Sequence, residues 1–352
     1  MTGKEATAGS ELTRLREADF AAQHGYDPSN GGISVEITII GSGAIGGAIG
    51  AHMIRAGHDV TLCDADEAHV AAIREHGLII EGPVDEFTVA ARAVTPSELP
   101  ARVPRAIVAV KSLHTSTAAE LLRGRLAPDG YVLTVQNGLT ADTLVEAVGR
   151  DRVVSSFVNF GADVMAPGRI MQGNVATFRV GELDGGRITP RVVDLVRALP
   201  YAKATGNVLG YLWGKEAYGA MLWAGALSDL TIAEHLEDPR YRPVMIAIAQ
   251  EVLAQAPVKV ESFDGFDPDD LEGSVGRLAA FNRNSAKKYS GIYRDLVVRK
   301  RKTEIDEMLR DINGPIFNKV AEIIHDIEEG RRVNERANLD ELADFVAALP
   351  AA

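Results

Sequence analysis

The chain has 352 residues, of which 46% are hydrophobic and 24% charged, and its 49 acidic and 37 basic side chains give a formal net charge of −12. This composition excludes a disordered or fibrous protein, and the length predicts two domains. The acidic balance argues against a nucleic-acid partner, because affinity for phosphate backbones comes from clustered Lys and Arg. The single cysteine, Cys63, cannot form an intramolecular disulfide, which favours a reducing, cytoplasmic location.

The N-terminal stretch carries no pattern for export. Residues 1–20 have no apolar core behind a basic start, and the longest nearly uncharged apolar stretch, residues 217–227, is much shorter than the roughly 20 residues that span a bilayer. We therefore expect no membrane partner. Residues 1–33 are polar, are expected to hold a short helix over 11–24 and end in the turn formers DPSNGG, so we interpret them as an N-terminal extension.

The segment after this extension has the order strand, turn, helix, strand. A β-branched run over residues 33–40 stops at Gly41, a small-residue helix follows, Gly57 is placed to end that helix, and residues 59–63 (DVTLC) form the next predicted strand. Together they predict one βαβ unit. Further strands are predicted at 106–110, 131–135, 153–157 and 176–180, and helices at 67–76, 115–126 and 141–148.

The alternation of strands and helices predicts a mostly parallel sheet with both faces covered, and so the α/β fold class. We assign residues 34–205 to a Rossmann-type dinucleotide-binding domain. From about residue 206 the pattern is helical throughout, which predicts an all-helical substrate and catalytic domain over residues 206–352.

The glycine-rich turn matches G-x-G-x-x-G between a buried strand and a helix. The first glycine permits the tight turn, the second lets the backbone approach a pyrophosphate, the third lets the helix pack on the strand, and the helix N-terminus offers N–H donors. Glycine-rich turns also occur for purely structural reasons, but a second feature, Asp64, follows at the expected distance. The predicted cofactor-binding residues of the turn are Gly41, Ser42, Gly43, Ala44, Ile45 and Gly46.

Asp64 ends the second predicted strand. An acidic side chain at this point accepts hydrogen bonds from the ribose hydroxyls of the adenosine half and repels a 2′-phosphate, so we expect NAD rather than NADP. Asp66 and Glu67 add negative charge nearby, and Arg74, the nearest downstream cation, is not expected to bind a phosphate. The alternative is an exposed strand-end aspartate without a ligand.

Two polar residues follow other predicted strands. Lys111 comes after the strand at 106–110, and Asn137 lies in the QNG turn after the strand at 131–135. The carboxyl ends of parallel strands form the edge at which open α/β sheets bind ligands, so we expect both residues at a ligand-binding edge of the sheet. Taken one at a time, each is equally consistent with a solvated strand end or a plain turn.

Lys215 lies in an otherwise apolar predicted helix, with Gly219 and Trp223 on its own face. Desolvation lowers the pKa of an ammonium group toward neutrality, which suits a residue that exchanges a proton with a carbonyl oxygen. The alternative is a lysine that snorkels from the rim of a core helix. The apolar stretch at 217–227 is also a candidate homodimer contact, and the basic run at 299–302, flanked by acidic residues, is interpreted as a solvated helix face.

These motifs, in this order, resemble the ketopantoate reductase (2-dehydropantoate 2-reductase) family over residues 35–345. They are the GSGAIG turn, the AVKS strand end, the QNG turn, WGKEA and TEID. The resemblance implies hydride transfer between a nicotinamide dinucleotide and a small acid. It also implies site residues: Lys215, Glu304 and Asn137 as catalytic residues, the lysine acting on the substrate oxygen; Lys111 and Asn137 as cofactor contacts; and Ser290 and Lys111 as substrate contacts.

Departures from the family pattern bear on substrate and cofactor. In place of the family's two substrate-binding asparagines and the proline that follow the lysine, this chain has Gly219, Trp223 and Ala224. Losing two amides that hold substrate hydroxyl groups predicts a different substrate, with Trp223 as an apolar wall. The family typically uses NADPH, whereas Asp64 favours NAD.

The sequence thus predicts an NAD(P)-dependent oxidoreductase that acts on a small hydroxy or keto acid. In the oxidation direction Lys215 is the expected general base, with Glu304 orienting it. The substrate carboxylate requires a cation or a hydroxyl, for which Lys111, Ser290 and Arg294 are candidates. Two alternatives stay open: an NADPH-dependent ketopantoate reductase proper, acting in pantothenate biosynthesis, and a dinucleotide-binding regulator without catalysis. No metal site is predicted.

Overall fold

The computed structural model describes residues 34–285 and 288–350, so the expected N-terminal extension and its helix over 11–24 lie outside the described residues. The chain divides into two compact units. Unit 1 comprises the described residues of Met1–Val110 together with Thr115–Gln136 and Thr143–Gly206, and unit 2 comprises Lys111–His114, Asn137–Asp142 and the described residues of Asn207–Ala352. Two short segments that follow strands of unit 1 therefore pack with the later part of the chain.

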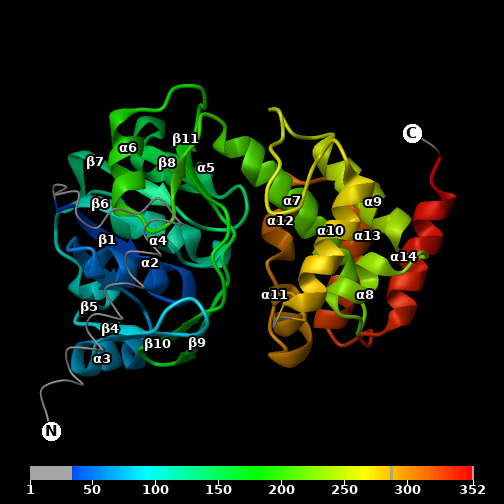
Figure 1. The fold of residues 1–352 in the computed structure, drawn as a ribbon, viewed down its shortest axis with the longest axis horizontal. Helices are drawn as coiled ribbons and strands as arrows, with labels where there is room; N and C mark the ends of the chain where they lie inside the picture. Colours follow the sequence, from blue (N-terminus) through cyan, green and yellow to red (C-terminus); the bar gives the residue numbers. More distant parts are fainter. Residues whose placement is uncertain (1–33, 286–287, 351–352) are drawn as a thin grey trace, which may run out of the picture. The chain divides into compact units, whose positions relative to one another are not determined.

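The core of unit 1 is an eight-stranded sheet (Figure 1). In sheet order its strands are β12 (Lys203–Ala204), β11 (Phe178–Glu182), β8 (Val153–Val158), β7 (Leu126–Thr134), β6 (Val103–Val108), β1 (Glu36–Ile40), β2 (Asp59–Cys63) and β5 (Arg92–Val94). All neighbouring strands are parallel except β8 and β11. The β-branched residues of β1 suit a strand covered on both faces, and Ile37, Ile39 and Ile40 are buried.

Helix α2 (Ala44–Arg55) packs between this sheet and a second, four-stranded sheet. The second sheet has the order β4 (Phe87–Val89), β3 (Leu78–Glu81), β10 (Arg169–Gln172) and β9 (Ala162–Ala166). A Cβ added at Gly46 would lie 3.0 Å from Cγ2 of Ile39 in β1, and one added at Gly47 would lie 2.3 Å from Cδ1 of Ile170 in β10. The small residues of α2 therefore let the helix approach both sheets closely.

The predicted α/β class and the predicted βαβ unit are confirmed. β2 has the predicted bounds, and α2 is followed by Gly57 in the left-handed conformation, with φ 88°. α3 (Glu67–His76) also has the predicted bounds, because Asp66 caps its first turn by accepting the N–H of Ala68. The remaining helices of unit 1 are α4 (Thr115–Leu122) and α6 (Pro190–Ala198), and α5 (Ala141–Val148), which begins in unit 2 and ends in unit 1, matches its prediction.

Other predicted bounds are wrong by a few residues. The strand expected at 106–110 ends at Val108, and the strand expected at 176–180 lies two residues later and pairs antiparallel with β8. The helix expected to reach residue 126 ends at Leu122, since Gly124 turns the chain with φ 75°. The second sheet was not predicted, because its strands are short and β3 pairs with a partner far along the chain.

The described part of unit 2 is helical apart from irregular segments and a single β-bridge between Phe263 and Phe266 (Figure 1). Its long first helix, α7 (Val208–Gly225), is capped by Asn207, whose Oδ1 accepts the N–H of Gly210. The other elements are α8 (Ile232–Glu237), α9 (Arg242–Leu253), α10 (Leu271–Asn284), α11 (Gly291–Tyr293), the π-helical segment η4 (Arg294–Val298), α12 (Ile305–Asp311), α13 (Pro315–Glu328) and α14 (Arg336–Ala348).

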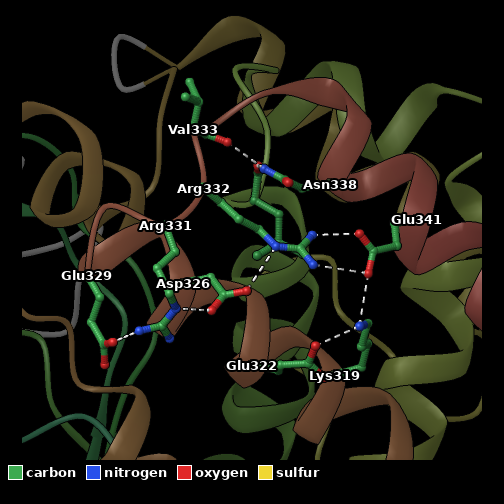
Figure 2. A network of polar contacts seen from close by, with 10 residues as sticks. Lys319, Glu322, Asp326, Glu329, Arg331, Arg332, Val333, Asn338 and Glu341 are labelled. Carbon is green, nitrogen blue, oxygen red and sulfur yellow. Dashed lines mark hydrogen bonds and ion pairs between the residues drawn. The ribbon is translucent and has the colours of Figure 1, made fainter.

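A network of polar contacts joins α13, α14 and the loop between them (Figure 2). Arg332 in the loop donates to Asp326 of α13 at 2.9 Å and to Glu341 of α14 at 2.5 Å. Lys319 forms ion pairs of 2.9 Å with both Glu322 and Glu341. Hydrogen bonds from Arg332 and Lys319 hold the pKa of Glu341 below its usual range. The network therefore fixes the last helix of the chain to its neighbour.

Candidate functional site

The glycine-rich turn of unit 1 has the geometry that its sequence predicts. Gly41 follows β1 with φ 92°, and its N–H donates to the carbonyl of Cys63 at 2.8 Å. An added Cβ at Gly41 would lie 2.8 Å from the backbone nitrogen of Val110, so a side chain is excluded there both by conformation and by space. Together with the close packing of Gly46 on β1, this brings the N-terminus of α2 to the carboxyl end of the sheet.

Gly43 differs from these glycines, because an added Cβ there would meet no protein atom within 4 Å. Packing within the described chain therefore does not require a glycine at this position. Gly43 is the N-cap residue of α2, and no side chain of the described residues caps the helix there. The first-turn N–H groups, which include those of Ala44 and Ile45, can thus serve an outside acceptor. An uncapped N-terminus beside an unobstructed glycine fits the pyrophosphate of a dinucleotide.

Asp64 lies at the end of β2 beside this turn. Its carboxylate accepts the N–H of Asp66 at 3.0 Å and the Ser42 hydroxyl at 3.4 Å, which holds it near the N-terminus of α2. Arg74 does not offer a free cation at this point, because it donates to Glu98 at 2.6 Å and to the carbonyl of Ala93 at 2.8 Å. The surroundings of Asp64 are therefore acidic.

Cys63, immediately before Asp64, is buried in the strand. Burial raises the pKa of its thiol to about 12, and the charges of Asp64 and Glu98 act in the same direction. The thiol is therefore held in its unreactive, protonated form.

His69 of α3 is a residue of this region that the sequence did not reveal. Its ring is buried, Nδ1 accepts the N–H of Gly168 at 3.0 Å, and Nε2 lies 3.0 Å from the carbonyl oxygen of Ser42. Since Nδ1 accepts, Nε2 is assigned the proton and donates to Ser42. The imidazole thus ties the glycine-rich turn to the loop between β9 and β10. Position 168 is too remote in the sequence for a local pattern to show this.

In unit 2, Lys215 and Asn137 lie together although they are 78 positions apart. Nζ of Lys215 donates to Oδ1 of Asn137 at 2.8 Å. Lys215 is half-buried in the middle of α7, and Asn137 is held in the turn that follows β7. The structure therefore brings two of the three predicted catalytic residues into direct contact.

Glu304 contacts another strand-end segment, at Ser112. Its Oε1 accepts the backbone N–H of Ser112 at 2.9 Å and also accepts the Ser112 hydroxyl. From the sequence we expect Glu304 to orient Lys215. In the structure, the hydrogen bonds described for the Glu304 side chain are those with Ser112. Ser112 was not predicted as a site residue, although it directly follows Lys111 in the AVKS motif.

Glu216, next to the predicted lysine, is a buried carboxylate in the same region. Its side chain accepts the N–H of Gly138, the residue after Asn137. Burial raises the pKa of Glu216 to about 7; Lys215 opposes this shift, and the charges of Asp311 and Glu304 support it. This burial could not be predicted from the sequence, since a glutamate on a helix is more often exposed.

Lys111 belongs to a cluster of three cations around one carboxylate. Asp295 accepts from Lys111 at 2.6 Å and from Arg299 and Arg301 at 2.8 Å each. Burial alone would raise the pKa of Asp295, but hydrogen bonds from the three cations outweigh it and lower the pKa to about 2. The four groups therefore carry a net charge of +2, and each cation is close to half exposed. The basic run is thus more than a solvated face.

The remaining predicted residues lie elsewhere in unit 2. Trp223 is buried and directs its indole N–H at the sulfur of Met308 in α12. A Cβ added at Gly219, one helical turn before Trp223, would meet no atom of the described residues within 4 Å outside the nearby backbone of its own helix. Ser290 is buried and caps α11 by accepting the N–H of Tyr293 at 3.1 Å.

The apolar stretch at 217–227 is used inside unit 2. Ala217, Ala220, Met221 and Ala224 are all buried within the unit. Its apolar character is therefore explained without a second copy of the chain, and the homodimer stays a prediction. Across the residues that the structure describes, no helix is long and apolar enough to cross a membrane. Over the same residues, no group of His, Cys, Asp and Glu side chains is arranged to hold a metal ion.

Comparison with known proteins supports the resemblance seen in the sequence. Residues 37–185 match the family model described as ketopantoate reductase PanE/ApbA. The 2-dehydropantoate 2-reductase of Streptococcus pyogenes serotype M6 is 27% identical over 307 residues, which cover 82% of this chain and 96% of that protein. A second relative, the 2-dehydropantoate 2-reductase of Pyrococcus abyssi, is 27% identical over 291 residues, 80% of this chain and 90% of its own. The chain is thus similar to ketopantoate reductases, through the family model over residues 37–185 and through these relatives.

Solved structures of ketopantoate reductases and related enzymes share this fold. The ternary structure of D-mandelate dehydrogenase with NADH and anilino(oxo)acetate has a TM-score of 0.73 at 21% identity and covers 85% of this chain and 100% of that one. The PanE/ApbA family ketopantoate reductase of Ralstonia eutropha JMP134 has a TM-score of 0.71 at 24% identity and covers 84% and 99%. The family match and these relatives support the prediction that this chain is an oxidoreductase that uses a nicotinamide dinucleotide.

Proposed function

We propose that this chain is a member of the ketopantoate reductase family and an NAD-preferring dehydrogenase of a small hydroxy acid that differs from ketopantoate's reduction product. Lys215 is the residue that exchanges the proton with the substrate oxygen. The observation that carries this assignment is the hydrogen bond from Lys215 Nζ to Asn137 Oδ1. It fixes the direction of a lysine that is half-buried in an apolar helix, beside a second buried titratable group.

Unit 1 is proposed as the dinucleotide-binding domain and unit 2 as the substrate and catalytic domain, with the division predicted at residue 205. In unit 1, the N–H groups at the start of α2 and the open side of Gly43 would hold the pyrophosphate. Lys111 and Asn137, which belong to unit 2, are proposed as further cofactor contacts. When bound, the nicotinamide supplies the acceptor or donor of the hydride.

The preference for NAD is inferred from Asp64. Its carboxylate is held by Ser42 and by the N–H of Asp66, and it would accept the ribose hydroxyls of the adenosine half. A 2′-phosphate at the same place would meet the charge of Asp64, and Arg74, the nearest downstream cation in the sequence, is bound to Glu98.

The proton moves at the substrate oxygen. In the oxidation direction a neutral Lys215 takes the proton of the substrate hydroxyl, and in the reduction direction its ammonium form returns it. Asn137 accepts one hydrogen bond from the lysine and so fixes the direction of the remaining Nζ valences. Glu304 is proposed as the second carboxylate of the site, held by the two donors of Ser112.

The altered substrate is inferred from the groups around α7. Gly219 offers no side chain and leaves space beside the helix, and Trp223 contributes an apolar ring where the family pattern has an amide. Lys111, with Arg299 and Arg301, is the candidate for the substrate carboxylate. These features favour an acid with an apolar substituent. D-mandelate is the first compound to test, because D-mandelate dehydrogenase has a similar fold.

Ketopantoate reductase proper, with NADPH, is the second candidate. Its support is that the curated relatives at 27% identity are named 2-dehydropantoate 2-reductases. A screen of hydroxy acids with NAD and NADP, and of keto acids with NADH and NADPH, separates the two candidates by absorbance of the nicotinamide. Turnover of ketopantoate with NADPH above all other pairs would contradict the first proposal.

The lysine is tested by Lys215→Ala in the same assay. We expect kcat to fall by about a hundredfold or more, as for removal of a general acid or base. Lys259→Ala, at an exposed lysine of the same unit, is the matched control and should behave like the wild type. Unchanged turnover in Lys215→Ala would contradict the proton-transfer role. If the wild-type protein binds the dinucleotide but turns over none of the acids, a regulator without catalysis is favoured.

A further inference from the structure

Two consecutive residues of α7 form hydrogen bonds with two consecutive residues of the turn after β7, Asn137 and Gly138. Lys215 donates to the side chain of Asn137, and the Glu216 carboxylate accepts the backbone N–H of Gly138. Gly138 has φ 82°, a conformation in which a side chain is disfavoured, so the turn presents its N–H and the neighbouring Asn137 side chain together. The turn is therefore held to the helix at two adjacent points.

We propose that Glu216 is a positioning residue, which fixes the Asn137–Gly138 turn so that Asn137 directs Lys215, and which supplies a negative charge beside that lysine. The proposal rests on the proposed function of Lys215. Glu216 touches neither substrate nor cofactor in this role, and it acts through the turn and through its charge.

Burial makes a purely structural explanation of Glu216 costly. A carboxylate that only had to accept one backbone N–H could be replaced by a glutamine, which accepts the same bond without a charge to desolvate. Glu216 is 6% exposed and belongs to a helix whose neighbouring residues Ala217 and Ala220 are fully buried. A buried ionisable group beside a proposed catalytic lysine is the arrangement expected where a charge serves the reaction.

The groups that act on Glu216 come from three elements and are mostly acidic. Lys215 on its own helix favours the charged form, whereas Asp311 at the end of α12 and Glu304 before α12 disfavour it. Burial, together with the charges of Asp311 and Glu304, raises the pKa of Glu216 to about 7. Burial and the charge of Asp142 also raise the pKa of Asp311, partly offset by Arg310. The charge beside Lys215 is therefore set within the physiological pH range.

The sign of the effect on the reaction follows from this charge. When Lys215 takes a proton from a substrate hydroxyl it becomes positive, and an ionised Glu216 stabilises that charge more than a protonated one does. Oxidation should therefore become faster as the pH rises through about 7. Reduction, in which Lys215 gives up its positive charge, should show the opposite trend through the same range.

The experiment compares Glu216→Gln with the wild type and with a matched control. Glutamine keeps the volume and can still accept the Gly138 N–H, but it carries no charge. Glu251→Gln is the control, because Glu251 also accepts backbone N–H groups, those of Ile316 at 2.9 Å and Phe317 at 2.8 Å. We expect Glu216→Gln to lower kcat about tenfold and to lose the change in kcat near pH 7, whereas Glu251→Gln keeps it.

A second readout does not need turnover. In a difference infrared titration of the unliganded protein, a carboxylic acid C=O band should disappear as the pH rises through about 7. That band should be missing from Glu216→Gln and retained in Glu251→Gln. Glu216→Ala, which also removes the acceptor of the Gly138 N–H, should lower kcat further than Glu216→Gln does.

The outcomes separate this inference from the proposed function. Loss of turnover in Lys215→Ala together with an unchanged pH profile in Glu216→Gln would overturn the inference and leave the function standing. Full turnover in Lys215→Ala would overturn the function. Absence of the titrating carboxyl band from the wild type would overturn the inference whether or not a substrate is found.

Discussion

Ser112 directs both of its donors, the backbone N–H and the hydroxyl, at a single carboxylate oxygen of Glu304. The two residues are 192 positions apart, and both belong to unit 2. Since Ser112 follows Lys111 and Lys111 is bound to Asp295, one short segment after β6 carries contacts to two acidic groups of the helical unit. This segment therefore positions the second proposed catalytic carboxylate.

Removing the Ser112 hydroxyl should loosen Glu304 without unfolding the unit. Ser112→Ala keeps the backbone N–H bond and loses the other, so we expect kcat to fall about tenfold while the dinucleotide Kd stays the same. Steady-state kinetics and a binding titration check both numbers. Ser262→Ala, which removes a hydroxyl that donates to Asp267 at 3.2 Å, is the control and should keep the wild-type kcat. An equal loss in both variants would contradict a specific role for Ser112.

Neutralising Asp64 should weaken the preference for NAD. Asp64→Asn keeps the shape of the side chain and removes the charge that would face a 2′-phosphate, so we expect the ratio of NADP to NAD affinity to rise about tenfold or more, which corresponds to about 1.4 kcal/mol. Fluorescence titrations with both dinucleotides measure the ratio. Asp85→Asn, at an ion pair of 2.7 Å with Arg55, is the control. Unchanged selectivity in Asp64→Asn would refute the assignment to the ribose.

The cluster of Lys111, Arg299 and Arg301 should contribute to binding of the substrate acid. Arg299→Ala removes one positive charge next to Lys111 and leaves Lys215 and Asn137 in place, so we expect KM for the acid to rise about tenfold with little change in kcat. The effect should also shrink at high salt, because the cations are close to half exposed. A fall in kcat without a rise in KM would show that the cluster does not serve the substrate carboxylate.

Two buried imidazoles should make the protein less stable in mild acid. Burial lowers the pKa of His52, in unit 1, and of His235, in unit 2, from 6.5 to about 4. The unfolded chain therefore binds more protons than the folded chain between these values, and the free energy of unfolding should fall as the pH is lowered from 6.5 to 4, by about 1.4 kcal/mol per pH unit for each histidine. Thermal unfolding at a series of pH values measures this slope. His235→Gln should flatten it, and a slope that the variant shares with the wild type would contradict the assignment.

The network in Figure 2 should stabilise the end of unit 2. Arg332→Ala removes the bonds to both Asp326 and Glu341, and we expect a loss of about 1 kcal/mol in the free energy of unfolding by urea. Arg240→Ala is the comparison, because its ion pair with Asp340 of the same helix is more exposed and should contribute less. A larger loss in Arg240→Ala than in Arg332→Ala would contradict the ranking.

The fold was predictable where local signals mark the ends of elements. Asp66 caps α3 and Gly57 ends α2, so the sequence indicates both boundaries. The second sheet carries no such signal: Ile79 of β3 pairs with Arg169 of β10, and neither strand is long enough to show an alternation. Its position depends on the tertiary packing of α2, which a local pattern does not contain.

The candidate site was predictable in its chemistry and not in its contacts. The family resemblance implied catalytic roles for Lys215 and Asn137 separately, and the structure brings the two side chains within 2.8 Å. The partner of Glu304 could not be predicted, because Ser112, the last residue of the AVKS motif, is 192 positions away in the sequence. Glu216 was missed for a different reason: its burial depends on tertiary packing, and the charges of Asp311 and Glu304 that act on it come from about ninety residues later.

The imidazole of His69 has a consequence for how variants of this protein are interpreted. It holds the carbonyl of Ser42 and the N–H of Gly168 with its two nitrogens. A substitution in the loop after β9 therefore reaches the glycine-rich turn through one ring, without touching the glycine motif itself. Because Gly168 has φ 73°, a side chain there would be strained, so substitutions at positions 69 and 168, 99 residues apart, should disturb the same turn.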